Sequence, residues 1–178
     1  MSETGRRLHI GGTARAPGWE VLNVQPGDHV DHVGRAEDLA RFPDGTFDAV
    51  YASHVLEHLA PRGALEAGLR EWLRVLRPGG TLYVSVPDLD VLCRLFADRE
   101  RLTPDERFTV MLMMFGGHAD EHDRHEIGFN KEFLSHFLLG AGFVDLRRVE
   151  SLGQFGDTSE LAFKGQRISL NVIARKPG

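Results

Sequence analysis

Imidazole and carboxylate groups, which bind metals and move protons near neutral pH, are concentrated in one short stretch of this chain. Nine histidines occur in all, and three of them lie with several acidic residues between His118 and Glu126. Neutral imidazole and carboxylate oxygen are common metal ligands. If the stretch were helical, His118, His122 and His125 would share one face, because each follows the previous one by about a turn.

The glycines on either side of this stretch favour a loop instead. Gly116-Gly117 precede it and Gly128 follows it, and glycines in these places interrupt a helical pattern. A metal site and a solvated polar loop are therefore both open interpretations. We assign no metal ligand from the sequence and keep His118 as a secondary catalytic candidate.

His54 is the first catalytic candidate, since Ser53-His54 lies at the carboxyl end of a predicted strand at residues 47–52 and an imidazole ordinarily titrates near neutral pH. It could act as a general base or orient the substrate group that accepts the transferred group. The structural alternative is that it caps a helix start or bonds a backbone carbonyl. We interpret Glu57-His58 as structural, with Glu57 closing the turn and His58 packing at the start of the next helix. The stretch from His54 to His58 is not a zinc-protease motif, which requires glutamate directly after the first histidine.

The elements that must position these groups alternate between strands and helices, which predicts an α/β fold with a mainly parallel sheet. A helix is expected after Pro61, two more after Pro87-Asp88, of which the second begins at a capping box at Thr103, and a further one from an Asn130 cap. Strands are expected at residues 8–10, 18–24, 29–33, 47–52, 81–86, 144–149 and 168–173.

The connections between these elements predict two departures from a regular parallel sheet. The first crossover has room for little or no helix between Gly11 and Gly18, although parallel crossovers normally take a dozen or more residues. The last strand, residues 168–173, is expected to run antiparallel to the others. No linker or repeat divides the chain, so residues 1–178 form one domain.

Composition excludes several classes of partner. With 21 basic and 26 acidic residues, the net charge of −5 does not favour binding to nucleic acid. The single cysteine, Cys93, excludes an intrachain disulfide and a cysteine zinc cluster. Because no apolar stretch suits a signal peptide or a membrane span, we expect a cytoplasmic protein without a membrane partner.

Two stretches of the sequence carry a resemblance to a known family. FPDGTFDAVYASHVLEHL at residues 42–59 and EWLRVLRPGGTL at 71–82, with Val86-Pro87-Asp88 and Ala141-Gly142-Phe143, resemble a class I S-adenosylmethionine-dependent methyltransferase of the small-molecule type. The similarity extends from about residue 8 to residue 174. It implies a Rossmann-like three-layer sandwich, S-adenosylmethionine as cofactor, and methyl transfer to a small-molecule or glycan hydroxyl or amine.

The resemblance also implies where the cofactor binds, because ligands of open parallel sheets lie beyond the carboxyl ends of the strands. Gly11-Gly12 would let the ligand approach the backbone closely, although Thr13 and Arg15 stand where the family's Gly-x-Gly-x-Gly pattern has further glycines. Asn23 and Gln25 stand where an acidic residue normally accepts bonds from the ribose hydroxyls.

The adenine contact departs from the family pattern as well. Gly34-Arg35-Ala36 replaces Gly-Asp-Ala, and an arginine cannot accept a hydrogen bond, so Glu37 or Asp38 is the expected acceptor. The full set of predicted cofactor residues is Gly11, Gly12, Asn23, Gln25, Ala36, Glu37, Asp38, Leu39 and Ser53.

The same resemblance places the acceptor beside His54 and lets a helical insert at residues 89–128 cover the cleft. The His118–His125 stretch thereby gains a third interpretation, as a lid. The altered cofactor motifs support a second hypothesis, a non-catalytic pseudo-enzyme of the same fold that binds a partner or metabolite. An NAD-binding dehydrogenase half is disfavoured, because the chain lacks Gly-x-Gly-x-x-Gly opening a helix.

Overall fold

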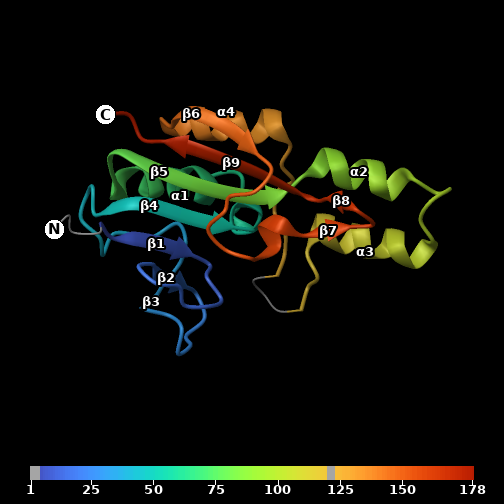
Figure 1. The fold of residues 1–178 in the computed structure, drawn as a ribbon, viewed down its shortest axis with the longest axis horizontal. Coiled ribbons are helices and arrows are strands. Elements are labelled where there is room, and N and C mark those ends of the chain that lie inside the picture. The colour runs from blue at the N-terminus through green and yellow to red at the C-terminus, as the bar shows by residue number, and fades with distance from the viewer. Residues whose placement is uncertain (1–4, 120–122) are drawn as a thin grey trace.

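The computed structural model describes residues 5–119 and 123–178, and a seven-stranded sheet forms its centre (Figure 1). The strand order is β3-β2-β1-β4-β5-β9-β6. The strands are β1 (Arg7–Ile10), β2 (Glu20–Asn23), β3 (His32–Val33), β4 (Phe47–Ser53), β5 (Leu76–Pro87), β6 (Val144–Val149) and β9 (Ser169–Arg175).

The sheet has a parallel core with an antiparallel strand near one edge. β1 pairs in parallel with β2 and β4, and β3 and β5 extend this arrangement on either side. β9 lies antiparallel between β5 and β6, because the chain turns back from β6 without a helical crossover. The prediction of a mainly parallel α/β sheet with an antiparallel last strand is confirmed.

Two helices, α1 (Ala64–Val75) and α4 (Lys131–Ala141), cover one face and lie behind the sheet in Figure 1. Leu69 and Trp72 of α1 and Leu138 of α4 are fully buried there. Val50 and Ala52 of β4 point into the same core, because alternate residues of a strand face the same side. Most of the apolar residues whose spacing predicted both helices thus pack in this core.

Irregular segments cover the opposite face of the sheet. Residues 11–19, the connection between β1 and β2, contain no helix, so the predicted short first crossover is confirmed. Tyr51 of β4 packs there against Trp19, Leu152 and Phe155. We call residues 150–161, which include the short helix η2 (Thr158–Glu160), the strap.

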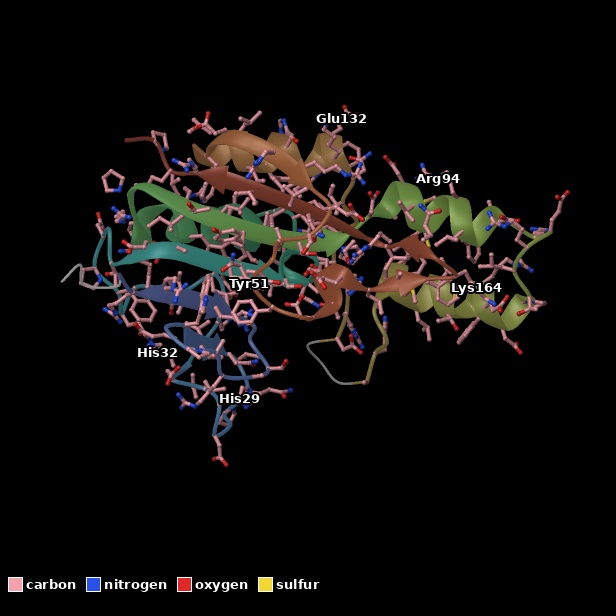
Figure 2. All side chains as sticks on the ribbon, viewed as in Figure 1. His29, His32, Tyr51, Arg94, Glu132 and Lys164 are labelled. Carbon is pink, nitrogen blue, oxygen red and sulfur yellow. The ribbon has the colours of Figure 1, made fainter. Side chains whose placement is uncertain are left out.

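A second, smaller core lies beyond the carboxyl ends of β4 and β5 (Figure 1). It joins α2 (Leu89–Ala97) and α3 (Pro104–Phe115) to the hairpin of β7 (Ala162–Phe163) and β8 (Gln166–Arg167). Thr103 and Glu106 form the predicted capping box of α3, and Lys164 of the hairpin pairs with Glu106 (Figure 2). No described helix combines the length and apolar character needed to cross a membrane.

Candidate functional site

A cavity of about 620 Å³ opens at the carboxyl ends of β1, β2 and β4. The strand order reverses between β1 and β4, and this is where open parallel sheets bind their ligands. The cavity is lined by His54 and by five of the predicted cofactor residues, which are Gly11, Asn23, Gln25, Ala36 and Glu37.

Gly11 shapes the cavity at the end of β1. Its φ of +74° lies in the left-handed region, which glycine adopts without strain. A Cβ at this position would lie 2.7 Å from Cγ2 of Val55. Gly12 lies just outside the cavity, where its carbonyl accepts a hydrogen bond from the Asn23 amide at 3.0 Å. Any side chain at Gly11 would therefore narrow the approach of a ligand to the backbone.

Asn23 holds together the two turns on this side of the cavity. Its Nδ2 donates to Gly12 O, and its Oδ1 accepts from the N–H of Gln25 at 3.0 Å. Gln25 is exposed at the cavity edge. The Asn23 amide, which replaces an acidic residue here, thus fixes the backbone, and Gln25 follows it at the edge of the cavity.

The loop after β3 places Glu37 rather than Asp38 at the cavity. Glu37 lines the cavity and accepts a hydrogen bond from Arg35 Nε, whereas the Asp38 carboxylate accepts from the Ala40 N–H at 3.2 Å. Leu39 is fully buried in the core. Of the two acidic residues that the sequence left as alternatives for the adenine contact, the geometry favours Glu37.

Ser53 lies on the opposite face of the sheet, against the strap. Its Oγ is 3.2 Å from Thr158 Oγ1 and 3.4 Å from Asp157 Oδ1. Tyr51, which projects from the middle of the sheet (Figure 2), donates to Asp157 Oδ2 at 2.8 Å, and burial raises its pKa. The predicted cofactor contact of Ser53 remains a prediction, but its hydroxyl serves to hold the strap.

His54 lines the cavity with a strained backbone (φ +55°). Ser169 Oγ donates to Thr158 O, so its oxygen accepts from His54 Nε2 at 2.9 Å. The His54 proton therefore sits on Nε2, and Nδ1 lies 3.4 Å from Glu57 Oε1. Burial lowers the pKa of His54 to about 4, so the ring is neutral at pH 7 and a weak base.

The stretch around His118 forms a loop in its described part. The His118 N–H donates to Asp123 O and the His125 N–H donates to Phe115 O, which confirms the loop interpretation over the helical one. His118 is exposed, with Nε2 3.1 Å from Phe115 O, and His122 lies outside the described residues. The described part of this stretch therefore lacks the helical spacing that would bring His118 and His125 to one face.

The insert at residues 89–128 reaches the cavity through the end of this loop. Arg124 and Glu126 line the cavity; both belong to the histidine-rich stretch, but neither was among the predicted site residues. The N–H of Glu126 donates to Glu57 O at 2.7 Å and ties the loop to the short helix η1 (Leu56–His58). Glu57 is buried, and burial raises its pKa to about 8.

Comparisons with known proteins agree with this geometry. Residues 19–84 match the family model described as a methyltransferase domain. The N-methyltransferase NodS from Bradyrhizobium japonicum WM9, solved with S-adenosylhomocysteine, aligns with a TM-score of 0.59 and 18% identity over 98% of this chain and 79% of that chain. The chain has the class I methyltransferase fold. This confirms the fold class and the resemblance found in the sequence.

Two further proteins support the same fold. The 1,6-didemethyltoxoflavin-N1-methyltransferase from Burkholderia thailandensis aligns to this methyltransferase-fold chain with a TM-score of 0.58 and 18% identity, over 98% of this chain and 72% of that chain. The ubiquinone/menaquinone biosynthesis C-methyltransferase UbiE from Pasteurella multocida (strain Pm70) is 34% identical over 80 residues. That match covers 43% of this chain and only 29% of UbiE.

Proposed function

We propose that this protein transfers a methyl group from S-adenosylmethionine to a hydroxyl or amine of a small-molecule or glycan acceptor. The observation that carries the proposal is the open cavity at the sheet's switch point, lined by residues from the ends of β1, β2 and β4. NodS and the toxoflavin methyltransferase, which share the fold, were both solved with S-adenosylhomocysteine. A cytoplasmic location belongs to the same proposal.

Each lining residue has a distinct part in the proposed binding. Gly11 would let the cofactor lie against the backbone, Gln25 would bond the ribose hydroxyls, and Glu37 would accept from the adenine amino group. The bound cofactor supplies an electrophilic methyl group, so the protein's main task is to align the acceptor with it.

His54 is suited to position the acceptor. Its neutral ring is held by Ser169 at the end of β4, next to the cavity. A buried ring with a pKa of about 4 is a poor proton acceptor at pH 7. Orientation of the acceptor is therefore a larger part of its proposed role than removal of a proton.

The alternative, a non-catalytic pseudo-enzyme, predicts a cleft filled by Arg15, Arg35 or the lid. Arg15 instead donates to Asp28 O and to Asp31 Oδ1. Arg35 pairs with Glu37 and keeps 66% of its side chain exposed. Neither side chain closes the cavity, which favours the methyltransferase over the pseudo-enzyme.

Calorimetric titration with S-adenosylhomocysteine tests the proposal, with Gly11→Ala and Gly79→Ala as a matched pair of variants. Both glycines have nearly the same φ, +74° and +72°, so both variants carry a similar backbone strain of about 1–2 kcal/mol. A Cβ at Gly79 meets nothing within 4 Å, whereas a Cβ at Gly11 reaches Val55.

We expect Gly11→Ala to weaken S-adenosylhomocysteine binding by about ten-fold or more, which corresponds to about 1.4 kcal/mol. Gly79→Ala should bind like the wild type. A flat titration of the wild type with both S-adenosylhomocysteine and S-adenosylmethionine would refute cofactor binding and leave only the fold. An equal loss in the two variants would show that the effect is one of general stability.

A further inference from the structure

Beside the cavity, three potential metal ligands converge from two distant segments of the chain. Glu57 and His58 belong to η1, and His125 belongs to the loop after α3. One ligand atom of each lies within 4.8 Å of those of the other two. The segments are joined by the hydrogen bond from the Glu126 N–H to Glu57 O, so the cluster is built on backbone contacts and not on chance proximity of side chains.

The Glu57 carboxyl group is buried without a hydrogen-bond partner. Its side chain is 1% exposed, and among residues 5–119 and 123–178 no other residue hydrogen-bonds to Oε1 or Oε2. The Nδ1 of His54, at 3.4 Å from Oε1, is the neighbouring polar atom outside the cluster. An ionised carboxylate is not kept in such surroundings without a cation, because its desolvation is too costly.

The two imidazoles are oriented by backbone carbonyls. His58 Nδ1 lies 2.9 Å from Arg124 O, and His125 Nδ1 lies 3.2 Å from Met114 O. A carbonyl oxygen only accepts, so each Nδ1 carries the proton and each Nε2 presents a lone pair. Histidines that bind metals are commonly fixed through the other ring nitrogen in this way.

We propose that Glu57, His58 and His125 bind a divalent first-row transition-metal cation, with Zn²⁺ as the best match. Two imidazole nitrogens and one carboxylate oxygen are a ligand set that zinc accepts, and three protein ligands leave a coordination position open. Ligand atoms around tetrahedral zinc lie about 3.4 Å apart. The three side chains must therefore approach one another by about 1.4 Å at most from their separations of up to 4.8 Å.

The open position would lie at the edge of the cavity, because His58, Arg124 and Glu126 all line it. An oxygen-bearing acceptor, such as a hydroxyl or carboxylate compound, is the class of molecule that could complete the coordination. This assignment of the acceptor rests on the proposed methyl transfer, whereas binding of the cation does not.

The cluster differs from the metal site that the sequence left open. His125 is shared by the two, but the ring of His118 is turned to Phe115 O. Glu57-His58, which the sequence interpretation treated as structural, supplies the other two ligands. No spacing rule could pair these residues with His125, since Glu57 and His58 precede α1 and β5, whereas His125 lies near the end of the insert.

Titration of tag-free, chelator-treated protein with Co²⁺ tests the proposal, because bound Co²⁺ absorbs visible light according to its ligands, and Zn²⁺ can then displace it. We expect saturable 1:1 binding in the wild type. Glu57→Gln keeps the side-chain volume and should weaken binding by about 100-fold or more, since even outer-shell changes cost about 10- to 100-fold. His136→Gln changes an exposed histidine on α4 and should bind like the wild type.

Two results would overturn the proposal: no saturable binding of Co²⁺ or Zn²⁺ up to about 1 mM, or wild-type affinity in Glu57→Gln. If Glu57→Gln fails to fold by circular dichroism, His58→Gln provides the same test at a half-buried position. Titration of the metal-free protein with S-adenosylhomocysteine tests the proposed methyl transfer independently of the cation site. Failure there refutes the proposed methyl transfer and leaves the cation site standing.

Discussion

Replacing Arg74 by methionine is expected to destabilise the protein by about 2–3 kcal/mol, because this side chain holds the loop between β3 and β4 against α1. Its Nη1 donates to Phe42 O and Asp44 Oδ1, both at 2.8 Å, and its Nη2 donates to Leu39 O at 3.0 Å. Nε and Nη2 also bond the Glu71 carboxylate. Methionine keeps the apolar stem and removes every donor.

The expected loss in the free energy of unfolding follows from the carbonyl groups that lose their hydrogen-bond donors. Two backbone carbonyls, of Leu39 and Phe42, lose charge-assisted donors that are worth about 1.5–3 kcal/mol each when buried. Arg74 is 27% exposed, so water can replace part of that loss, and Asp44 at 80% exposed adds little. For a chain of this length, about 2–3 kcal/mol lowers the thermal midpoint by roughly 5–10 °C.

Thermal unfolding followed by circular dichroism measures the effect, with Arg70→Met as the matched control on the same helix. Arg70 is 63% exposed and reaches Glu66 only at 3.8 Å, so its loss should cost less than about 0.5 kcal/mol. Because residues 34–37 of the same loop line the cavity, Arg74→Met should also weaken S-adenosylhomocysteine binding. Equal midpoints for the two variants would refute the reasoning.

Three further predictions concern the site and the pH dependence of stability. Gln25→Glu should tighten S-adenosylhomocysteine binding by about ten-fold, because a carboxylate accepts stronger bonds from ribose hydroxyls; unchanged affinity in calorimetry would place the ribose elsewhere. His54→Ala should lower methyl transfer by about 100-fold through misplacement of the acceptor with S-adenosylhomocysteine affinity nearly unchanged, and a parallel loss of affinity would argue against an acceptor role. The hydrogen bond from Arg6 lowers the pKa of Glu20 to about 2, with a further contribution from His32. Its stabilisation is therefore complete above the ordinary value of 4.5 and is lost as pH falls toward 2. With 28% of the side chain exposed, we discount the contribution to about 1–2 kcal/mol. Urea unfolding at neutral pH and near pH 3 should show that Glu20→Gln is less stable than the wild type at neutral pH, and that this deficit is smaller near pH 3, where part of the stabilisation is already lost.

Patterns along the chain predicted most of the elements. The cap at Thr103 with Glu106, and the Asn130 cap of α4, occur as the sequence indicated. The predicted strand at residues 29–33 is shorter, because the Val30 N–H donates to Gly27 O in a turn and pairing begins only at His32. Such features depend on neighbours within a few residues, which is why sequence patterns report them.

The candidate site was predicted only in part. Gly11, Gln25 and Glu37 reach the cavity as expected from their places after successive strands. Ser53 is the last residue of β4, but strand alternation and the strap direct its hydroxyl to the other face. The sequence shows at which strand end a residue lies. The contacts of its side chain depend instead on which segment packs on that face of the sheet, as the strap does on Ser53.

The sequence by itself therefore determined the mainly parallel α/β sheet, the short first crossover and the strand ends at which a ligand would bind. Only the tertiary structure decided that the strap covers the second face of the sheet, and that Glu57 and His58 meet His125. Periodicity and capping act between residues close along the chain. The convergence of side chains from distant segments is instead set by the packing of the whole domain, which no local pattern encodes.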